Sequence, residues 1–207
     1  MLVIVAAISA RGQSFQNLNF ESAYNLPGNP GNNGTSVAVA NALPDWTAYG
    51  AGNPLSDIYY VSNNFPGVST LVELESGSLA LSGNNLSVGL YNGGSISQTG
   101  LVPTNAESLQ FEGSIPGGAG FSVTLGGQSL SYSLLSEGPN YDVYEANIPA
   151  NLNGQMEALD FLCQGPGSGN VLLDDADFIS VPEPSEYALV GLGAILLGLR
   201  HRRKQQR

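Results

Sequence analysis

The chain has 207 residues, enough for one domain with targeting segments, and its apolar content of 42% argues against a disordered protein. Its net charge of −11 is unevenly distributed, because five of the six Lys and Arg residues lie in the last eight positions. Residues 13–180 contain 15 of the 17 carboxylates and no Lys, Arg or His. Such a segment repels phosphate backbones, which excludes nucleic acid as a partner. Calcium and neutral sugars are compatible partners, and a solvated, solubilising acidic surface is the simpler explanation.

Residues 1–12 have the features of a secretory signal peptide. Residues 2–10 form an apolar stretch, and cleavage after Gly12 would place the small residues Ala10 and Gly12 at positions −3 and −1. The basic n-region is missing, since Met1 is followed directly by the apolar stretch; a start codon placed too late would explain this. A buried first strand is the alternative interpretation.

Residues 13–180 show the apolar alternation of β-strands in about ten short runs, with turn residues between them at spacings of roughly 8–12 residues. The runs are SFQNLNFES (14–22), TSVAVANAL (35–43), DIYYVS (57–62), STLVELES (69–76), GSLALSG (77–83), LSVGLYN (86–92), SLQFEGS (108–114), GFSVTLGGQSLSYSLLSE (120–137), YDVYEANIP (141–149), MEALDFLCQ (156–164) and VLLDDADFIS (171–180). Residues 126 and 127, both Gly, predict a two-residue primed hairpin turn. With no helical periodicity between the runs, the sequence predicts an all-β, antiparallel two-sheet sandwich of jelly-roll type.

Both ends of this body resemble galactose-binding-like jelly-roll domains. FQNLNFESA (15–23) followed by LPDWTAYG (43–50) resembles their opening, and GNVLLDDADFIS (169–180) resembles their closing strand. In that family the first and last strands pair and bring a carboxylate from each to a structural calcium ion. The resemblance therefore implies Glu21 with Asp174 or Asp175 as calcium ligands, with backbone carbonyls completing the shell. The alternative is that these carboxylates simply face solvent.

Trp46, Tyr49, Tyr59 and Tyr60 belong to the densest aromatic cluster of the sequence. Exposed rings of this kind stack on pyranose faces in carbohydrate-binding modules. Core packing is the alternative, with Trp46 closing one end of the sandwich after its Pro-Asp turn. Because strand side chains alternate, Tyr59 and Tyr60 should point to opposite faces and one of them should be exposed.

The inventory of reactive groups excludes most enzyme classes. His201 is the only histidine and lies in the basic tail, so residues 13–180 cannot build a Ser-His-Asp or Cys-His site. Zinc sites and Schiff-base chemistry fail for want of His, Lys and a second Cys. Cys163, in an apolar stretch, is predicted to be a buried structural thiol. A two-carboxylate glycosidase remains formally possible, but we predict a non-catalytic protein.

The C-terminal segment, residues 181–207, combines three features in order: the motif Pro182-Glu183-Pro184, an apolar helix over 187–199, and a basic tail over 200–207. The 12 apolar residues from Ala188 to Leu199 span about 18 Å as a helix, less than the roughly 30 Å of a bilayer core. Interfacial anchoring by Tyr187 and snorkelling of Arg200 would extend this single short transmembrane helix. The basic end predicts a cytoplasmic tail with residues 13–186 outside.

This order of motif, helix and basic end resembles the PEP-CTERM sorting signal of Gram-negative, biofilm-forming bacteria. The resemblance implies processing by exosortase, a membrane cysteine transpeptidase that cuts near the Pro-Glu-Pro motif. It also implies transient anchoring in the inner membrane, followed by release to the cell surface or the extracellular matrix, where extracellular polysaccharide is a further partner. An ordinary tail anchor is the alternative. For the body, we predict a surface or matrix protein, with a lectin-like module as the alternative and a glycosidase more remotely.

Overall fold

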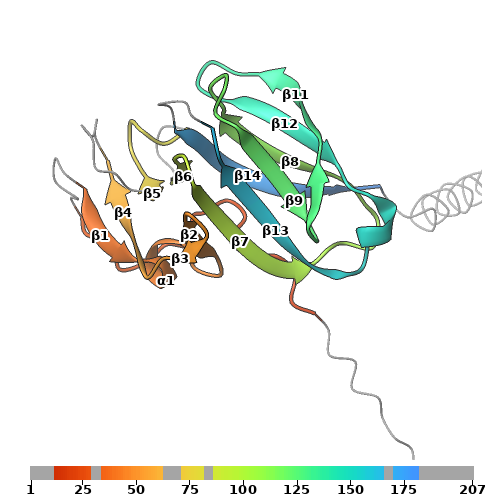
Figure 1. Cartoon of the computed structure of the whole chain (residues 1–207), viewed down its shortest axis with the longest axis horizontal. Coiled ribbons are helices and arrows are strands. Elements are labelled where there is room, and N and C mark those ends of the chain that lie inside the picture. The colour runs from red at the N-terminus through yellow and green to blue at the C-terminus, as the bar shows by residue number, and fades with distance from the viewer. Residues whose placement is uncertain (1–11, 29–33, 63–70, 82–85, 166–169, 182–207) are drawn as a thin grey trace, which may run out of the picture.

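Two β-sheets pack face to face in the computed structural model of the chain, which describes residues 12–28, 34–62, 71–81, 86–165 and 170–181 (Figure 1). The eight-stranded sheet runs, in spatial order, β1 (Thr35–Ala38), β4 (Asp57–Val61), β5 (Val72–Glu75), β6 (Ser87–Leu90), β14 (Val171–Ser180), β8 (Ala106–Ser114), β12 (Asp142–Asn147) and β11 (Tyr132–Glu137). The six-stranded sheet runs β10 (Gln128–Leu130), β9 (Phe121–Leu125), β13 (Met156–Cys163), β7 (Gly94–Leu101), β2 (Thr47–Gly50) and β3 (Asn53–Pro54). The predicted all-β, two-sheet sandwich is therefore confirmed.

Several details differ from the sequence-based prediction; the run over 77–83, for example, forms no strand in its described residues, 77–81. The neighbours β4 and β5 pair in parallel, with Tyr59 opposite Glu73, whereas the other paired strands that the structure describes are antiparallel. Two short helical turns also occur, α1 (Val39–Ala42) and the 3-10 turn η1 (Ala150–Leu152). Neither turn is long enough to give a periodic signal in the sequence.

The hairpin predicted around two glycines is present between β9 and β10. Leu125 pairs with Gln128, and the intervening Gly126 and Gly127 both have positive φ, 58° and 72°. Positive φ at both central residues defines the primed turn that matches the twist of a hairpin. The run that follows does not form one continuous strand, because β10 ends at Leu130 and β11 begins at Tyr132 in the opposite sheet.

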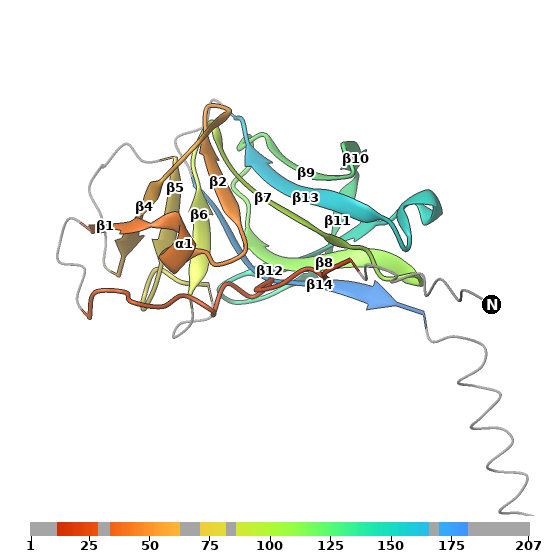
Figure 2. The same cartoon turned by 90° about the horizontal axis from the view of Figure 1, so that it is seen from below.

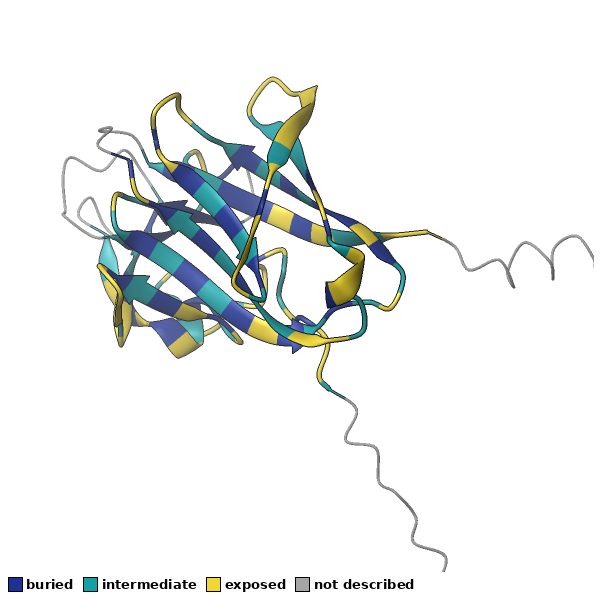
Figure 3. Ribbon diagram, turned by 45° about the vertical axis from the view of Figure 1, so that its right-hand side comes forward, coloured by how far each residue is buried: buried dark blue, intermediate teal, exposed yellow. Residues whose placement is uncertain are grey.

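The core lies between the sheets and is built by alternation along each strand, visible as blue and lighter residues in Figure 3. Phe111 of β8 is 1% exposed and contacts the rings of Phe121 and Phe161 from the opposite sheet at centroid distances of 5.9 and 5.7 Å. Cys163 is 1% exposed and its Sγ lies 3.3 Å from the carbonyl oxygen of Ala119. The prediction of a buried structural thiol is confirmed.

The N-terminal segment, residues 12–28, was predicted to contain a strand over 14–22 and does not. It lies against both sheets: Leu101 N–H of β7 donates to the Gln13 carbonyl at 2.8 Å, and Ala176 N–H of β14 donates to the Leu18 carbonyl at 3.0 Å. The ring of Phe15 stacks on Phe178 of β14 at 5.0 Å. Figure 2 shows this segment in red, running past β14. The first and last parts of the domain are therefore neighbours, which positions the site described next.

Candidate functional site

Glu21 and Asp174 are brought to one corner of the molecule by the contact between the N-terminal segment and β14. Phe20, which is fully buried and has a φ of 57°, turns the chain so that Glu21 is exposed beside the start of β6. The Oε1 atom of Glu21 accepts a hydrogen bond from the N–H of Leu86 at 2.8 Å. This carboxylate thus joins the N-terminal segment to the residue that precedes β6.

Asp174 is 1% exposed although it carries a carboxylate. It lies on the outer face of the eight-stranded sheet, because its neighbour Leu173 points into the core. Its Oδ2 accepts from Ser87 Oγ at 3.1 Å, and its Oδ1 accepts from the N–H of Asp175 at 2.9 Å. Burial raises the pKa of Asp174 from 3.8 to about 7; the charges of Asp175 and Glu21 add to this rise, and the two hydrogen bonds oppose it.

Asp175 occupies a β-bulge, where the register of β14 against β8 shifts between Asp174 and Asp177. Its φ is 39° and it is exposed. After burial, the charge of Asp175 is the next cause that raises the pKa of Glu112 on β8, while a hydrogen bond with Tyr141 lowers it. The bulge therefore places two consecutive carboxylates of β14 among acidic neighbours with no basic group.

Of the three carboxylates predicted as calcium ligands, Glu21 and Asp175 are thus both near enough to Asp174 for their charges to raise its pKa. Carboxylate oxygens are the donors that Ca²⁺ prefers, and the pKa of Asp174 is raised first by its burial and then by its acidic neighbours. Across the residues that the structure describes, however, no three His, Cys, Asp or Glu side chains converge closely enough to form a complete metal-binding group. Backbone or water oxygens would have to complete a calcium shell here.

A second pair of carboxylates, Glu73 and Glu75 on β5, escaped the sequence analysis. Both lie on the outer face, since Val72 and Leu74 point into the core, yet they are only 1% and 3% exposed. Tyr91 Oη donates to Glu73 Oε2 at 3.3 Å, and the side-chain amide of Asn170 donates to Glu75 Oε1 at 2.9 Å.

Burial and then the charge of Glu73 raise the pKa of Glu75 from 4.5 to about 8. The same two causes, followed by the charge of Glu75, raise the pKa of Tyr91. In the sequence, the alternation VELE predicts outward carboxylates and gives no signal that they are covered. Because its pKa is raised to about 8, Glu75 carries a proton at neutral pH, where a solvated glutamate would be charged.

Trp46 lies in the core, 4% exposed, with its ring 5.5 Å from that of Phe20 and 6.1 Å from that of Phe161. Its Nε1–H donates to the carbonyl of Asn17 at 2.9 Å. A ring enclosed in this way offers no face to a sugar. The core-packing alternative is therefore the one that describes Trp46.

The three tyrosines predicted with Trp46 are distributed over both sheets. Tyr49 lies on β2 of the six-stranded sheet, whereas Tyr59 and Tyr60 are consecutive on β4 of the eight-stranded sheet, and all three are half-buried. Tyr60 packs against the core and its Oη accepts a hydrogen bond from Ser76 Oγ at 3.1 Å. The structure therefore does not bring these aromatic residues together into one stacking platform.

The predicted sorting motif Pro182-Glu183-Pro184, the apolar helix over 187–199 and the basic tail over 200–207 lie outside the described residues, as do residues 1–11 of the predicted signal peptide. Within the described ranges, no helix has the length and apolar character needed to cross a membrane. The last described residue, Val181, is held by Asn105: its N–H donates to the Asn105 carbonyl at 3.2 Å, and its carbonyl accepts from the Asn105 side chain at 2.6 Å.

Comparison of the chain with protein-family models, with curated proteins and with solved structures found no match in any of the three.

Proposed function

We propose that this chain is a non-catalytic, exported protein of the cell surface or extracellular matrix, delivered by its C-terminal PEP-CTERM signal and processed there by an exosortase-type transpeptidase. The position of the motif relative to the fold carries the proposal. β14 ends at Ser180, and Val181 is exposed immediately before Pro182-Glu183-Pro184. The motif thus follows the last strand without an intervening linker, and its prolines favour an extended backbone suited to a protease-like site.

The strand order supports the jelly-roll assignment for the exported domain. Eight of the strands, β6, β7, β8, β9, β10, β12, β13 and β14, are divided four and four between the two sheets, in the order that two Greek keys require. In the eight-stranded sheet they lie in the order β6, β14, β8 and β12, which are the first, eighth, third and sixth of these strands along the chain. In the six-stranded sheet they lie in the order β7, β13, β9 and β10, which are the second, seventh, fourth and fifth. The remaining strands extend this framework at its edges.

The absence of catalysis is supported by the state of the acidic residues. A glycosidase needs two accessible carboxyl groups that flank the scissile bond. Glu73 and Glu75 lie two residues apart on β5 and are only 1% and 3% exposed, and burial raises the pKa of Glu75. Carboxyl groups enclosed to this extent have no access to a polysaccharide chain.

Mass spectrometry of the protein recovered from an exosortase-containing Gram-negative host tests the export proposal. We expect the mature C-terminus to lie near Pro184, and a Pro182→Ala/Pro184→Ala double variant to keep its HRRKQQR end. Pro54→Ala is the matched control, because Pro54 is exposed on β3 far along the chain from the motif, and it should be processed normally. An intact basic tail on the mature wild-type protein would leave an ordinary membrane anchor instead.

A structural calcium ion at the corner of Glu21, Asp174 and Asp175 is a second proposal, supported by the burial of Asp174 beside acidic neighbours. A cation bound only by the folded state stabilises it by an amount that grows with the logarithm of the cation concentration relative to its Kd. We expect a chelator to lower the melting temperature of the wild-type protein but not that of Asp174→Asn. Asp177→Asn, an exposed carboxylate on the same strand, is the control that should keep the chelator response. A wild-type melting temperature unaffected by chelator contradicts the calcium site and leaves the export proposal untouched.

A further inference from the structure

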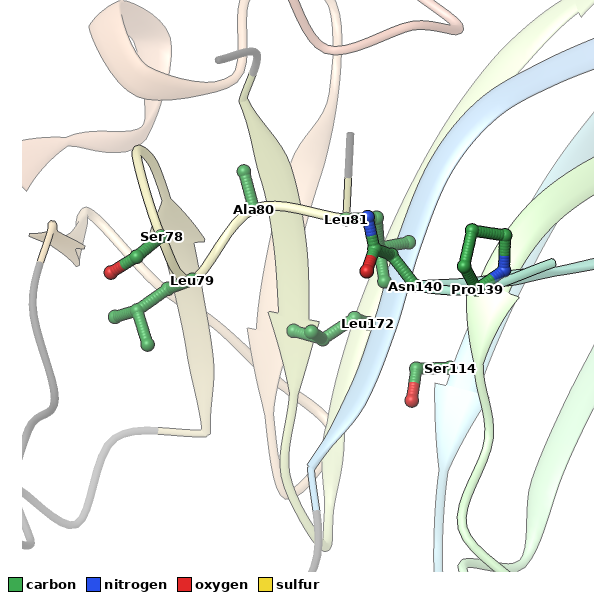
Figure 4. Close-up of a pocket in the computed structure, with 8 residues that line it drawn as sticks. All are labelled: Ser78, Leu79, Ala80, Leu81, Ser114, Pro139, Asn140 and Leu172. Carbon is green, nitrogen blue, oxygen red and sulfur yellow. The ribbon is translucent and has the colours of Figure 1, made fainter. Parts of the chain in front are cut away.

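We propose that a hollow on the outer face of the eight-stranded sheet binds a neutral saccharide. The hollow has a volume of about 430 Å³, within the range of roughly 300–1,000 Å³ common for small-ligand sites. It lies between the loop after β5, the end of β8, the connection from β11 to β12, and β14 (Figure 4). None of the predicted aromatic residues lines it, so it is distinct from the cluster considered above.

Three side chains that can form hydrogen bonds line this hollow from separate parts of the chain. Ser78 comes from the loop after β5, Ser114 from the last position of β8, and Asn140 from the turn before β12. Among the described residues, none of these three side chains has a hydrogen-bonding partner. Their hydroxyl and amide groups are therefore available to bond the hydroxyl groups of a ligand.

The rest of the lining is aliphatic. Leu172 of β14 lies directly across from Ser114 in the strand register, so one polar and one apolar side chain form a cross-strand pair beneath the hollow. Leu79 and Pro139 line it from the two sides. A pyranose presents both C–H surfaces and hydroxyl groups, and this mixture of aliphatic and hydroxyl or amide groups complements both.

Charge decides among the possible ligand classes. No residue that lines the hollow is charged, and residues 13–180 contain no Lys, Arg or His that could pair with a phosphate or carboxylate. A cationic ligand would require an accessible carboxylate, but Asp174, two residues beyond Leu172 on the same face, is 1% exposed and does not line the hollow. The uncharged lining therefore favours a neutral, hydroxyl-rich ligand.

This inference goes beyond the proposed function, because the exported domain reaches the matrix whether or not the hollow is occupied. If saccharide binding fails while the tail is still processed, only the inference fails. If processing fails, binding by the purified protein can still be measured.

The test is binding of defined sugars to the full chain in a detergent without a sugar headgroup. Saturation-transfer NMR and titration calorimetry with methyl glucoside, methyl galactoside and cellobiose provide the signal, with inorganic phosphate and spermidine as charged probes. We expect at least one neutral sugar to bind, and Asn140→Ala and Ser114→Leu each to weaken it at least tenfold. Asn53→Ala, an exposed asparagine on β3 of the other sheet, should bind as the wild type does.

Asn140 is exposed and unbonded among the described residues, so Asn140→Ala should keep the wild-type melting temperature, which separates lost binding from lost folding. No binding of any of the three sugars would overturn the proposal. Equal binding to wild type and both variants would place the sugar elsewhere on the domain and also overturn it. Stronger binding of spermidine or phosphate at Asn140 would overturn the assignment of a neutral ligand.

Discussion

Trp46 illustrates what a single residue contributes to this fold. Its indole fills the space between Phe20 of the N-terminal segment and Phe161 of β13, and its N–H satisfies the carbonyl of Asn17. The residue therefore joins a segment without regular strand structure to the core. Both its packing and its hydrogen bond stabilise the position of the chain that leads to Glu21.

We predict that Trp46→Phe destabilises the protein by about 1–2 kcal/mol, because it removes part of the ring and one of the two hydrogen bonds that the Asn17 carbonyl accepts, the other coming from the N–H of Phe20 at 3.2 Å. Trp46→Ala should cost about 3–5 kcal/mol through the cavity it leaves. Denaturant unfolding monitored by circular dichroism measures both changes. Unfolding curves identical to wild type would contradict a core role. Tyr49→Phe, a half-buried ring on β2, serves as the control with a small expected effect.

Alternation along a strand could predict which face each residue occupies, but not whether that face is covered. For β5, VELE correctly places Val72 and Leu74 inside, and the same rule predicts solvent-facing glutamates. The burial of Glu73 and Glu75 depends on residues distant in sequence, such as Tyr91 and Asn170, which no local pattern connects to β5. Periodicity gives no signal for Glu21 and Asp174 either; their pairing was predicted only from the resemblance to galactose-binding-like domains.

At the scale of the elements, β7 is the longest strand that periodicity missed, the short strands β2 and β3 being the others. Its inward positions are Gly94, Ile96, Gln98 and Gly100, so only one of four carries an apolar side chain. The Gln98 side chain faces inward because it bonds the backbone of Gln16: its Oε1 accepts from the Gln16 N–H at 2.7 Å, and its Nε2 donates to the Gln16 carbonyl at 2.9 Å. These positions accommodate the N-terminal segment rather than contributing apolar bulk, and a rule based on apolar alternation cannot recognise such a strand.

The same contact explains why SFQNLNFES, although it alternates, is not a strand. Phe15 and Phe20 are buried as predicted, but the backbone between them bonds partly to side chains, as at Gln98, and adopts positive φ at Asn17 and Phe20. The burial of alternate residues was predictable from the sequence, whereas the absence of continuous backbone hydrogen bonding to a neighbouring strand was not. Propensity gives way here to the packing of particular side chains.

Gly100 provides a test of this docking. A Cβ at position 100 would lie 2.7–2.8 Å from atoms of the buried Phe15 ring, which stacks on Phe178 and has little room to move. We predict that Gly100→Ala destabilises the protein by about 1–3 kcal/mol through overpacking. Gly117→Ala, where a Cβ would meet nothing within 4 Å, should change stability by less than about 0.5 kcal/mol. Equal unfolding free energies for the two variants would contradict close docking of the segment.

At the scale of the whole molecule, the domain has many carboxylates and no basic residue with which to pair them. Salt bridges cannot offset the burial of Glu75 and Asp174, so hydrogen bonds from Asn170 and Ser87 provide part of the compensation and protonation provides the rest. The pKa values of Glu75 and Asp174 rise to about 8 and about 7. Folding is therefore coupled to proton uptake.

The sign of this coupling predicts a protein that is more stable in mild acid than in mild alkali. Between pH 4.5 and about 8 the folded state retains a proton on Glu75 that the unfolded state releases, so the free energy of unfolding falls as pH rises through this window. Asp174 acts in the same direction between pH 3.8 and about 7. At roughly 1.4 kcal/mol per pKa unit, the Glu75 shift corresponds to a loss of about 5 kcal/mol across its window. Glu145, whose pKa is lowered by bonds from Gln110 and Ser108, opposes this trend at the acidic end.

Denaturant unfolding between pH 5 and 8.5, with chelator present to exclude bound metal, measures this slope. Glu75→Gln keeps a side chain that can bond Asn170 but cannot ionise, so its unfolding free energy should vary less with pH than that of the wild type and exceed it near pH 8. Glu137→Gln on β11, an exposed glutamate, should retain the wild-type slope. Stability that stays flat or rises with pH would show that Glu75 is not enclosed as the fold places it. A slope removed by Glu75→Gln alone would locate the main proton-linked group of the domain under the outer face of β5.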